Sequence, residues 1–428
     1  MSTDATPSWS GYIFQGEVAL CKAIETIVSL GDDIPDNYCL KLEEDEDFSL
    51  KTDCFEVFQV KAYLSNDSAK ISKYRPVIEE LINKYYYSKC AKINLTDNRK
   101  KIITYSLRVR KKPIKCSLIT HKNITDYPKN LSTFNKRFQI NTNYFNTIDG
   151  VYTLENINQK LKDSIRAYLN NPNLIDSDLE DKVSYCSKKI CDIVKKRHST
   201  KVKESIKLNT IKKWINDSTI SFTEEICWFE ITKIFLNSIS DGVDDYDLTN
   251  AEELEIYNKI QKSLCEFENL SNVDMVNLLK SYLSPHKKLE NNNLRNTYGS
   301  FIDNETVKSV ILKGIKRIKV NPIYKRLQYV KTNGENLNRY QLLIHNNEFD
   351  NDTAGKKAFQ KHCEMIYNNP NTKDIDYFIT KGLSKEKEEV KSRLLEITDG
   401  GNEAEDFNYF GFKTIDTSIN ELNDEDNN

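Results

Sequence analysis

Two neighbouring segments hold the residues whose chemistry is easiest to interpret. Asp47 opens one apolar stretch, and Gln59 and Lys61 stand two positions apart in the next one. In an extended strand alternate side chains share a face, so Gln59 and Lys61 project together, and a hairpin would bring Asp47 within reach of both. Hard divalent cations prefer oxygen ligands, which the Asp47 carboxylate, the Gln59 amide and the Val60 carbonyl would supply. A lysine beside such a cation orients a water molecule and stabilises phosphate charge, so the set predicts metal-assisted phosphodiester hydrolysis.

This pattern has structural alternatives, because a hairpin of any charged protein can contain the same residue types. Several acids of the run from Glu43 to Asp47 are expected to be a solvated turn. Glu17 is either a functional acid or a surface glutamate whose stem covers apolar atoms. Gln59 is neutral, so the set carries less negative charge than paired carboxylates would, which predicts weak metal binding until substrate phosphates add ligands, or a degenerate site that only binds. Lys61 on a mostly apolar strand argues against degeneracy, since burying an unused charge is costly.

The elements that would position these residues follow from the hydrophobic periodicity. Apolar residues at helical spacing predict a helix over residues 11–30 that ends at Gly31, with Glu17 on its apolar face. The period then changes to two, and the Thr52-Asp53 step predicts a hairpin. A further helix is predicted around residues 77–82. The predicted strands are 38–42, 47–51, 55–61, 102–109 and 114–120, which makes residues 1–130 a small α/β domain.

Residues 8–130 resemble the PD-(D/E)XK nuclease superfamily, in the variant in which glutamine replaces the second acid. The resemblance is carried by Trp9-Ser-Gly-Tyr-Ile-Phe-Gln15 at the start of the first helix, by Leu42-Glu43 leading to Asp47-Phe48, and by Phe58-Gln-Val-Lys-Ala62. Within this superfamily the chain is most similar to the double-strand DNA endonuclease domain of bacterial antiviral effectors. It is closest to the nuclease subunit of Lamassu systems, which are also called ABC-three-component systems.

The resemblance implies a restriction-endonuclease-like fold that cleaves double-stranded DNA with Mg2+, or with Mn2+ in its place. By position, the catalytic residues would be Asp47, Gln59, Lys61 and Glu43, and the metal would be held by Asp47, Gln59, Val60 and Glu17. The resemblance also implies a cytoplasmic defence role against phage or plasmid DNA. It further implies restraint by an SMC-like ATPase subunit and a small accessory subunit, and assembly into a homo-oligomer on activation.

Charge is strongly segregated, although the formal net charge is only -2. Residues 88–140 hold fourteen Lys and Arg against two acids, and the densest part is the predicted DNA-binding surface or, alternatively, a solvated face. Its members are Arg108, Arg110, Lys111 and Lys112. Residues 399–428 hold nine acids and only one basic residue, Lys413. This acidic tail, with aromatic residues between Phe407 and Phe412, is predicted to be a docking peptide, an electrostatic shield or a disordered terminus.

The composition sets wider limits. The chain has 428 residues with 38% hydrophobic and 29% charged, which is a core-forming composition long enough for two or three domains. No apolar run reaches the roughly 20 residues of a membrane span, the ten cysteines lack zinc-site spacing, and the five histidines are isolated in the sequence. The absence of a Gly-rich phosphate loop argues against an ATPase.

Helical periodicity dominates from residue 154 onward. It predicts a linker over residues 131–153 and a helical domain over residues 154–398, before the acidic tail. The resemblance implies that this helical domain binds the partner. The predicted fold class is therefore α+β/α, an N-terminal restriction-endonuclease-like α/β domain followed by a mainly α-helical domain. Two other functions stay open: a non-catalytic DNA-binding or adaptor subunit, and an effector that senses a nucleotide through its C-terminal half.

Overall fold

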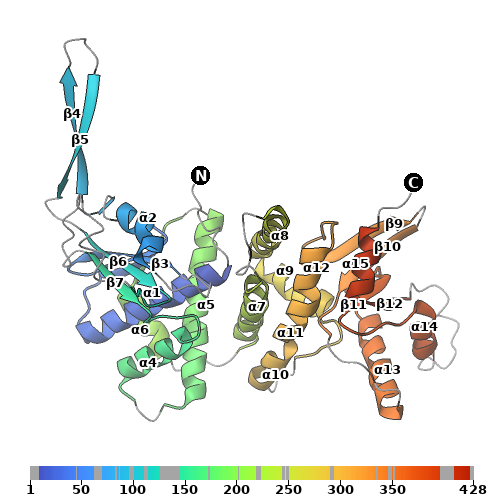
Figure 1. Ribbon diagram of the computed structural model, residues 1–428. Coiled ribbons are helices and arrows are strands. Elements are labelled where there is room, and N and C mark those ends of the chain that lie inside the picture. Colours follow the sequence, from blue (N-terminus) through green and yellow to red (C-terminus); the bar gives the residue numbers. More distant parts are fainter. Residues whose placement is uncertain are drawn as a thin grey trace. The chain divides into compact units, whose positions relative to one another are not determined.

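The computed structural model divides the chain into two compact units, each of which is described by itself (Figure 1). The N-terminal unit is Gly11–Ser221, and the C-terminal unit is Phe222–Asn428 together with Met1–Ser10. The structure describes residues 9–44, 46–61, 70–81, 84–85, 87–95, 101–109, 114–125, 145–171, 174–200, 202–217, 223–242, 246, 250–289, 294–333, 336–345, 349, 352–395 and 409–424.

A six-stranded mixed sheet forms the centre of the N-terminal unit, in the order β7-β6-β3-β2-β1-β8. Its strands are β1 (Cys39–Leu42), β2 (Phe48–Lys51), β3 (Phe55–Lys61), β6 (Lys115–Thr120), β7 (Phe145–Asp149) and β8 (Ser205–Lys207). The first three strands form the predicted antiparallel meander, whereas β6 is parallel to β3 and β7 is parallel to β6. β8 pairs antiparallel with β1, so a strand far along the chain completes this sheet.

Helices cover both faces of the sheet (Figure 1). On one face, Phe48, Phe58 and Val60 share an apolar core with α1 (Trp9–Leu30), α4 (Ile157–Leu169), α5 (Asp176–Thr200) and α6 (Leu208–Asn216). On the other face lies α2 (Ile71–Leu81), where the thiol of Cys116 approaches the carbonyl of Leu81. The first helix ends as the sequence predicts, because Gly31 takes the left-handed conformation with a φ of 76°.

Several elements of the N-terminal unit differ from the prediction. β4 (Tyr87–Leu95) and β5 (Lys101–Val109) pair with each other as a separate two-stranded sheet, and the sequence predicts only the second of these strands. The segment 131–153, predicted to be a linker, contains β7. Helices α4, α5 and α6, predicted for the second domain, pack in the N-terminal unit, and the two units divide between residues 221 and 222.

The C-terminal unit begins with helices, as predicted. These are α7 (Glu224–Ser240), α8 (Ala251–Glu268), α9 (Asn272–Asn277), α10 (Leu294–Phe301), α11 (Asn304–Thr306) and α12 (Lys313–Arg317), with π-helical turns over Leu278–Leu283 and Val307–Leu312. No helix in the part of the chain that the structure describes is long and apolar enough to cross a membrane.

A four-stranded sheet completes the C-terminal unit, in the order β12-β11-β10-β9. Its elements are β9 (Gln328–Asn333), β10 (Asn336–Leu342), α13 (Thr353–Tyr367), β11 (Tyr377–Thr380), α14 (Lys387–Leu395), β12 (Gly411–Thr414) and α15 (Ile415–Asn423). The prediction of a mainly helical domain as far as residue 398 is therefore wrong in its last part. Apolar runs as short as β11 cannot be assigned to helix or strand by periodicity alone.

The segment predicted as an acidic tail is folded where the structure describes it. Phe410 and Phe412 are only 3% and 1% exposed and pack in one core with Phe359 and Phe378. The prediction that these two aromatic residues belong to a free docking peptide is wrong, because they contribute to the core of the C-terminal unit. Phe407 lies outside the described residues.

Candidate functional site

The hairpin between β2 and β3 brings the predicted site residues together. Phe48 pairs with Phe58 across the hairpin, so Asp47 comes to lie beside Gln59 at the end of the ladder. The Oδ2 atom of Asp47 accepts a hydrogen bond from the backbone N–H of Val60 at 2.5 Å and another from Nε2 of Gln59 at 3.2 Å. The carboxylate thus bridges from the start of β2 to β3, as the sequence predicts.

The backbone of β3 directs a carbonyl oxygen to the same place. The carbonyl of Lys61 accepts a hydrogen bond from His121 on the β6 side. Because neighbouring residues in a strand direct their polar backbone groups to opposite edges, both polar groups of Val60 point to the β2 side, where Asp47 lies. The Val60 carbonyl, the Asp47 carboxylate and the Gln59 amide therefore meet at one edge, beyond the end of β2.

Burial raises the pKa of Asp47 to about 6. Loss of solvation is the main cause, and the nearby acids Glu46 and Glu43 raise this pKa further. The hydrogen bond from Val60 and the positive charge of Lys61 act in the opposite direction. Lys61 therefore lies near enough to influence the carboxylate. A divalent cation at this edge would favour the ionised form in the same way as Lys61 does.

Two other acids of the 43–47 run, Glu44 and Glu46, have neighbours of their own. Glu44 forms an ion pair with Lys41 at 3.2 Å, and Glu46 accepts hydrogen bonds from Lys84 at 2.8 Å and Tyr85 at 3.1 Å. The structural interpretation, a charged turn, therefore fits Glu44 and Glu46. Asp47 differs from them because its carboxylate turns toward the backbone of β3.

Glu43 shapes the turn that precedes Asp47. Its φ is 49°, a left-handed conformation that is uncommon for a residue with a side chain, and its N–H donates to the carbonyl of Asp47 at 2.8 Å. The guanidinium of Arg197, on α5, donates to the carbonyls of both Leu42 and Glu43. The sequence alone did not single out Arg197 for this position.

Glu17 occupies a different position from the hairpin residues. It is 5% exposed on α1, which packs against the face of the sheet that carries Phe58 and Val60. Gln59 and Lys61 alternate with those residues and project to the other face. Glu17 therefore approaches the sheet from the face opposite to Lys61.

The oxygen atoms at the hairpin are of the type that hard cations bind, although few of them belong to charged groups. Among the residues that the structure describes, no three or more His, Cys, Asp and Glu side chains form a group that could hold a metal ion. A Mg2+ ion here would depend on the Asp47 carboxylate, the Gln59 amide oxygen and the Val60 carbonyl, with further oxygens from water or substrate. In the described arrangement Gln59 offers its N–H group to Asp47, so its amide would have to turn to present the oxygen.

The predicted DNA-binding cluster cannot be located in the same detail. Arg108 belongs to β5, but its side chain lies outside the described part of the structure. Arg110, Lys111 and Lys112 also lie outside the described residues. The prediction for these four residues therefore stays a prediction.

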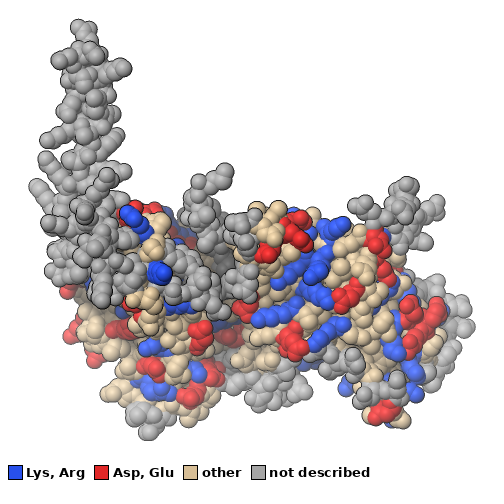
Figure 2. Space-filling model, in the orientation of Figure 1, with Lys and Arg blue, Asp and Glu red and all other residues tan. Residues whose placement is uncertain are grey.

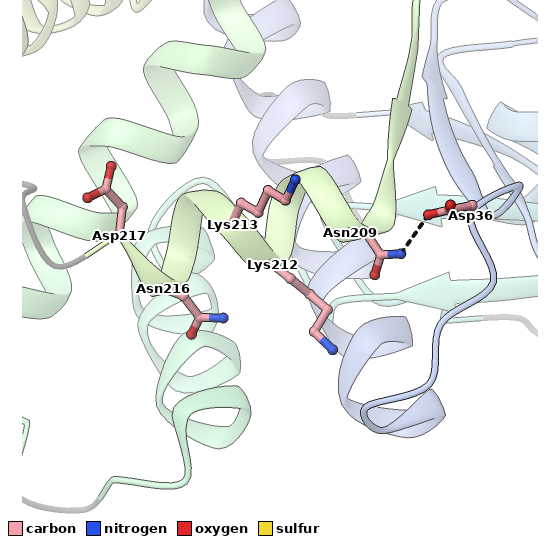
Figure 3. Close-up of a pocket in the computed structure, with 6 residues that line it drawn as sticks. All are labelled: Asp36, Asn209, Lys212, Lys213, Asn216 and Asp217. Atoms are coloured by element: carbon pink, nitrogen blue, oxygen red, sulfur yellow. Dashed lines mark hydrogen bonds between the residues drawn. The ribbon is translucent and has the colours of Figure 1, made fainter.

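An open groove on the N-terminal unit lies at a different edge of the sheet from the hairpin site. Its volume is about 580 Å³, and α6 forms much of its wall (Figure 3). Its lining residues are Asp36, Asn209, Lys212, Lys213, Asn216 and Asp217. Asn209 donates to Asp36 at 3.2 Å, and Lys212 donates to the carbonyl of Asp32 at 3.0 Å. Because acids and bases are mixed in its wall, the groove favours no single class of charged ligand.

Positive charge on the C-terminal unit is largely balanced by acids. Figure 2 shows lysine and arginine side chains interspersed with aspartate and glutamate on the face in view. Four basic residues between positions 308 and 326 form ion pairs at 2.7 to 3.4 Å. The pairs are Lys308–Asp241, Lys313–Asp416, Lys325–Asp274 and Arg326–Asp374. At these four described positions the positive charge is therefore neutralised by a nearby acid.

Three histidines that are far apart in the sequence gather inside the C-terminal unit. The ring of His362 lies 4.4 Å from that of His286 and 4.3 Å from that of His345, and the third pair is 5.2 Å apart, measured between centroids. Burial lowers the pKa of His345 to about 4 and that of His362 to about 2, and it lowers the pKa of His286 as well. These imidazoles are therefore neutral at pH 7.

The fold and the hairpin define an α/β protein with a group of polar residues at the end of two central strands, joined to a helical region that ends in a second sheet. A family model matches residues 131–383, and it describes C-terminal domain 1 of the ABC-three component (ABC-3C) systems. Because the match covers more than half of the chain, this protein belongs to that family and is a component of an ABC-3C defence system. No curated protein and no solved structure matches the chain.

The family match confirms the ABC-three-component part of the sequence resemblance. The matched region begins at residue 131, which lies within the N-terminal unit. It therefore includes α4, α5 and α6, which pack on the same sheet that carries Asp47 and Lys61. The hairpin itself lies outside the matched residues.

Proposed function

We propose that this chain is a metal-dependent DNA endonuclease, the nuclease subunit of its ABC-3C system and of the type called LmuA in Lamassu systems. The observation that carries the proposal is the convergence of the Asp47 carboxylate, the Gln59 amide and the polar backbone groups of Val60 at the edge of β3, beside Lys61. The order helix, meander, helix and parallel strand around this site supports the PD-(D/E)XK resemblance.

Each residue of the site has a task that follows from its chemistry. Mg2+ would supply a Lewis acid and a water molecule of lowered pKa. Asp47, Gln59 and Val60 present oxygen atoms on one edge, where such an ion would be held. Lys61 places a positive charge where the phosphate gains negative charge in the transition state. Glu43 shapes the turn that carries Asp47, and its carboxylate is the candidate for an additional acid.

Double-stranded DNA is the proposed substrate, and the other ABC-3C components are the proposed partners. The sequence resemblance implies an SMC-like ATPase and a small accessory subunit among them. A single nuclease active site cleaves one DNA strand. Cleaving both strands therefore needs two copies of the chain, one on each strand. Assembly into a homo-oligomer is therefore the proposed control of activity. Arg108, Arg110, Lys111 and Lys112 are the proposed phosphate contacts, which would make DNA binding depend on salt but not on sequence.

Plasmid cleavage by the purified chain, alone and with its partner subunits, tests the proposal. Lys61→Ala should lower the cleavage rate by at least about a hundredfold, because it removes transition-state charge stabilisation. Lys51→Ala is the matched control, since Lys51 lies in the same hairpin but is exposed to solvent. Equal cleavage by the Lys61 variant and the wild type, in the presence of Mg2+, would show that the active site lies elsewhere.

A non-catalytic DNA-binding subunit is the second candidate, and one observation favours it. The site contains Gln59 in place of an acid, and no group of acids suited to a metal occurs among the described residues. A wild-type chain that binds duplex DNA but cuts none, with Mg2+ or Mn2+ and with its partners present, would select this function over the nuclease.

A further inference from the structure

We propose that Arg197 is a positioning residue, through which the ABC-3C region of the chain controls the turn that carries Asp47. This inference deepens the proposed nuclease function and rests on it for its catalytic consequence. Its structural part rests only on contacts inside the N-terminal unit. Arg197 lies in the family-matched region, whereas the turn from Leu42 to Asp47 lies outside it.

The contact consists of two hydrogen bonds from one guanidinium group. Two nitrogens of the Arg197 guanidinium donate to two successive backbone carbonyls, those of Leu42 and Glu43. The planar guanidinium places parallel N–H groups at a fixed spacing, which a lysine ammonium cannot reproduce. Both hydrogen bonds therefore require an arginine at position 197.

The turn depends on an outside donor. Glu43 holds a left-handed φ of 49°, which a residue with a side chain adopts reluctantly. Its N–H closes the turn on the carbonyl of Asp47, and the carbonyls of Leu42 and Glu43 accept hydrogen bonds from Arg197. Arg197 thus holds the two residues from which the chain turns toward Asp47, and the Asp47 carboxylate then meets the N–H of Val60.

Arg197 is anchored on both sides along the chain. Before it, Leu179, Val183 and Ile190 of α5 are buried in the same core as Phe48 and Phe58. After it, β8 pairs with β1, with Ile206 opposite Leu40. The guanidinium is therefore held beside the end of β1 by the helix and by the strand. A displacement of the last turns of α5 would withdraw both donors from the turn.

The regulatory consequence follows from this connection. A partner subunit that binds the ABC-3C region and shifts the end of α5 would release the turn without touching Asp47, Gln59 or Lys61. The site would then lose the alignment of the Asp47 carboxylate with β3 while the sheet remained folded. Arg197 joins the matched region directly to the turn before Asp47.

Hydrogen exchange on the full-length chain, read at the amides of Glu43 and Val60, tests the positioning role without requiring cleavage. In Arg197→Gln both amides should exchange at least about tenfold faster, and in Arg197→Lys the change should be intermediate, because the charge remains but the paired donors are lost. Lys196→Gln is the matched control. It removes a charge from the adjacent residue, which is exposed and pairs with Glu204 at 2.5 Å, and it should leave both amides unchanged.

Cleavage kinetics complete the test. If the chain cuts DNA, Arg197→Gln should lower kcat by roughly tenfold to a hundredfold with little change in KM, as misplacement of a catalytic group does. A loss confined to KM would show that Arg197 contacts DNA instead, and unchanged exchange at Glu43 and Val60 would overturn the positioning role. If exchange responds but the wild type never cuts, the nuclease proposal fails and the positioning role stands. If Arg197→Gln unfolds the whole N-terminal unit, Arg197→Lys decides the question by the same two amides.

Discussion

The hairpin site and the histidine cluster are both buried polar groups, and they respond to burial in opposite ways. Burial raises the pKa of Asp47 to about 6, and it lowers the pKa of His345 to about 4. Asp47 nevertheless has two donors and a nearby lysine, so its charged form is partly supported. The histidines instead lie ring against ring, next to Phe349 and Phe412.

The two regions differ in how their buried polar atoms are hydrogen-bonded. At the hairpin, two N–H donors from β3, those of Gln59 and Val60, converge on the Asp47 carboxylate at the end of two central strands. In the histidine cluster, Nδ1 of His286 and Nε2 of His362 are buried and make no hydrogen bond within the described part of the chain. The rings there contribute mainly packing area, and their polarity is a cost to stability. We therefore expect the two regions to respond differently to mutation and to pH.

Phe412→Ala should give the largest effect, since Phe412 is 1% exposed and packs against both His362 and Phe378. The free energy of unfolding of the C-terminal unit should fall by about 3–5 kcal/mol, as for other buried phenylalanines. Ile323→Ala is the control, because Ile323 is 49% exposed and should change stability by less than about 0.5 kcal/mol. Chemical denaturation followed by circular dichroism measures both. Equal small effects would mean that the end of the chain is not part of the core.

Acid should destabilise the C-terminal unit through its histidines. Between pH 6.5 and 4 an unfolded chain protonates His345 while the folded chain does not, so stability is present above pH 6.5 and is lost as the pH falls. A shift from 6.5 to about 4 corresponds to about 3 kcal/mol for this residue. Denaturation curves at several pH values measure it. His345→Phe should flatten the dependence, and an unchanged slope in that variant would show that other groups cause it.

Asp47→Asn should stabilise the N-terminal unit at pH 7 while abolishing DNA cleavage. The folded-state pKa of this acid is raised from 3.8 to about 6, so the folded chain binds the extra proton between these values and stability falls as the pH rises through that window. Removing the charge should recover about 1–2 kcal/mol, less than the full shift implies because a hydrogen bond weakens.

The thermal midpoint at pH 7, with and without Mg2+, measures this effect. Mg2+ should raise the midpoint of the wild type but not that of Asp47→Asn, since the variant lacks the anionic ligand. A variant that is less stable than the wild type at pH 7 would contradict the assignment of Asp47 as a group that is costly to bury in its ionised form.

Gln59→Glu should have the smallest effect on stability and a clear effect on metal binding. A second carboxylate raises the charge of the ligand set, so half-maximal Mg2+ binding should occur at a roughly tenfold lower concentration. Calorimetric titration of the metal-binding equilibrium measures the change. An unchanged Mg2+ affinity would show that residue 59 is not a ligand and would weaken the comparison with metal nucleases.

The sequence predicted the local arrangement of the hairpin well. The helix ending at Gly31 and the meander that places Asp47 beside Gln59 both follow from periodicity over short distances. Arg197 could not be found in this way, because it reaches the turn from more than 150 residues along the chain. β7 and β8 were missed for the same reason, since three to five residues gain their strand structure only from non-local partners.

In the C-terminal unit the wrong prediction of a tail came from the acidic composition of its last residues. The nine acids of residues 399–428 led to the prediction of an acidic tail. The segment nevertheless folds where it is described, because burying the rings of Phe410 and Phe412 stabilises it and the acids can remain solvated. The short strands β11 and β12 pair in parallel and depend on α13, α14 and α15 around them. No local pattern reveals such pairing.

The position of β8 late in the sequence has a consequence for folding during synthesis of the chain. β1 keeps a bare edge until residues 205–207 have been made, and Arg197 arrives only shortly before them. At about 5–20 residues per second, translation needs on the order of ten to thirty seconds to cover that distance. During this interval the nascent chain already contains Asp47, Gln59 and Lys61, but its turn is not yet clamped. A fragment that ends before residue 197 therefore lacks both the guanidinium that contacts the turn before Asp47 and the strand that pairs with β1.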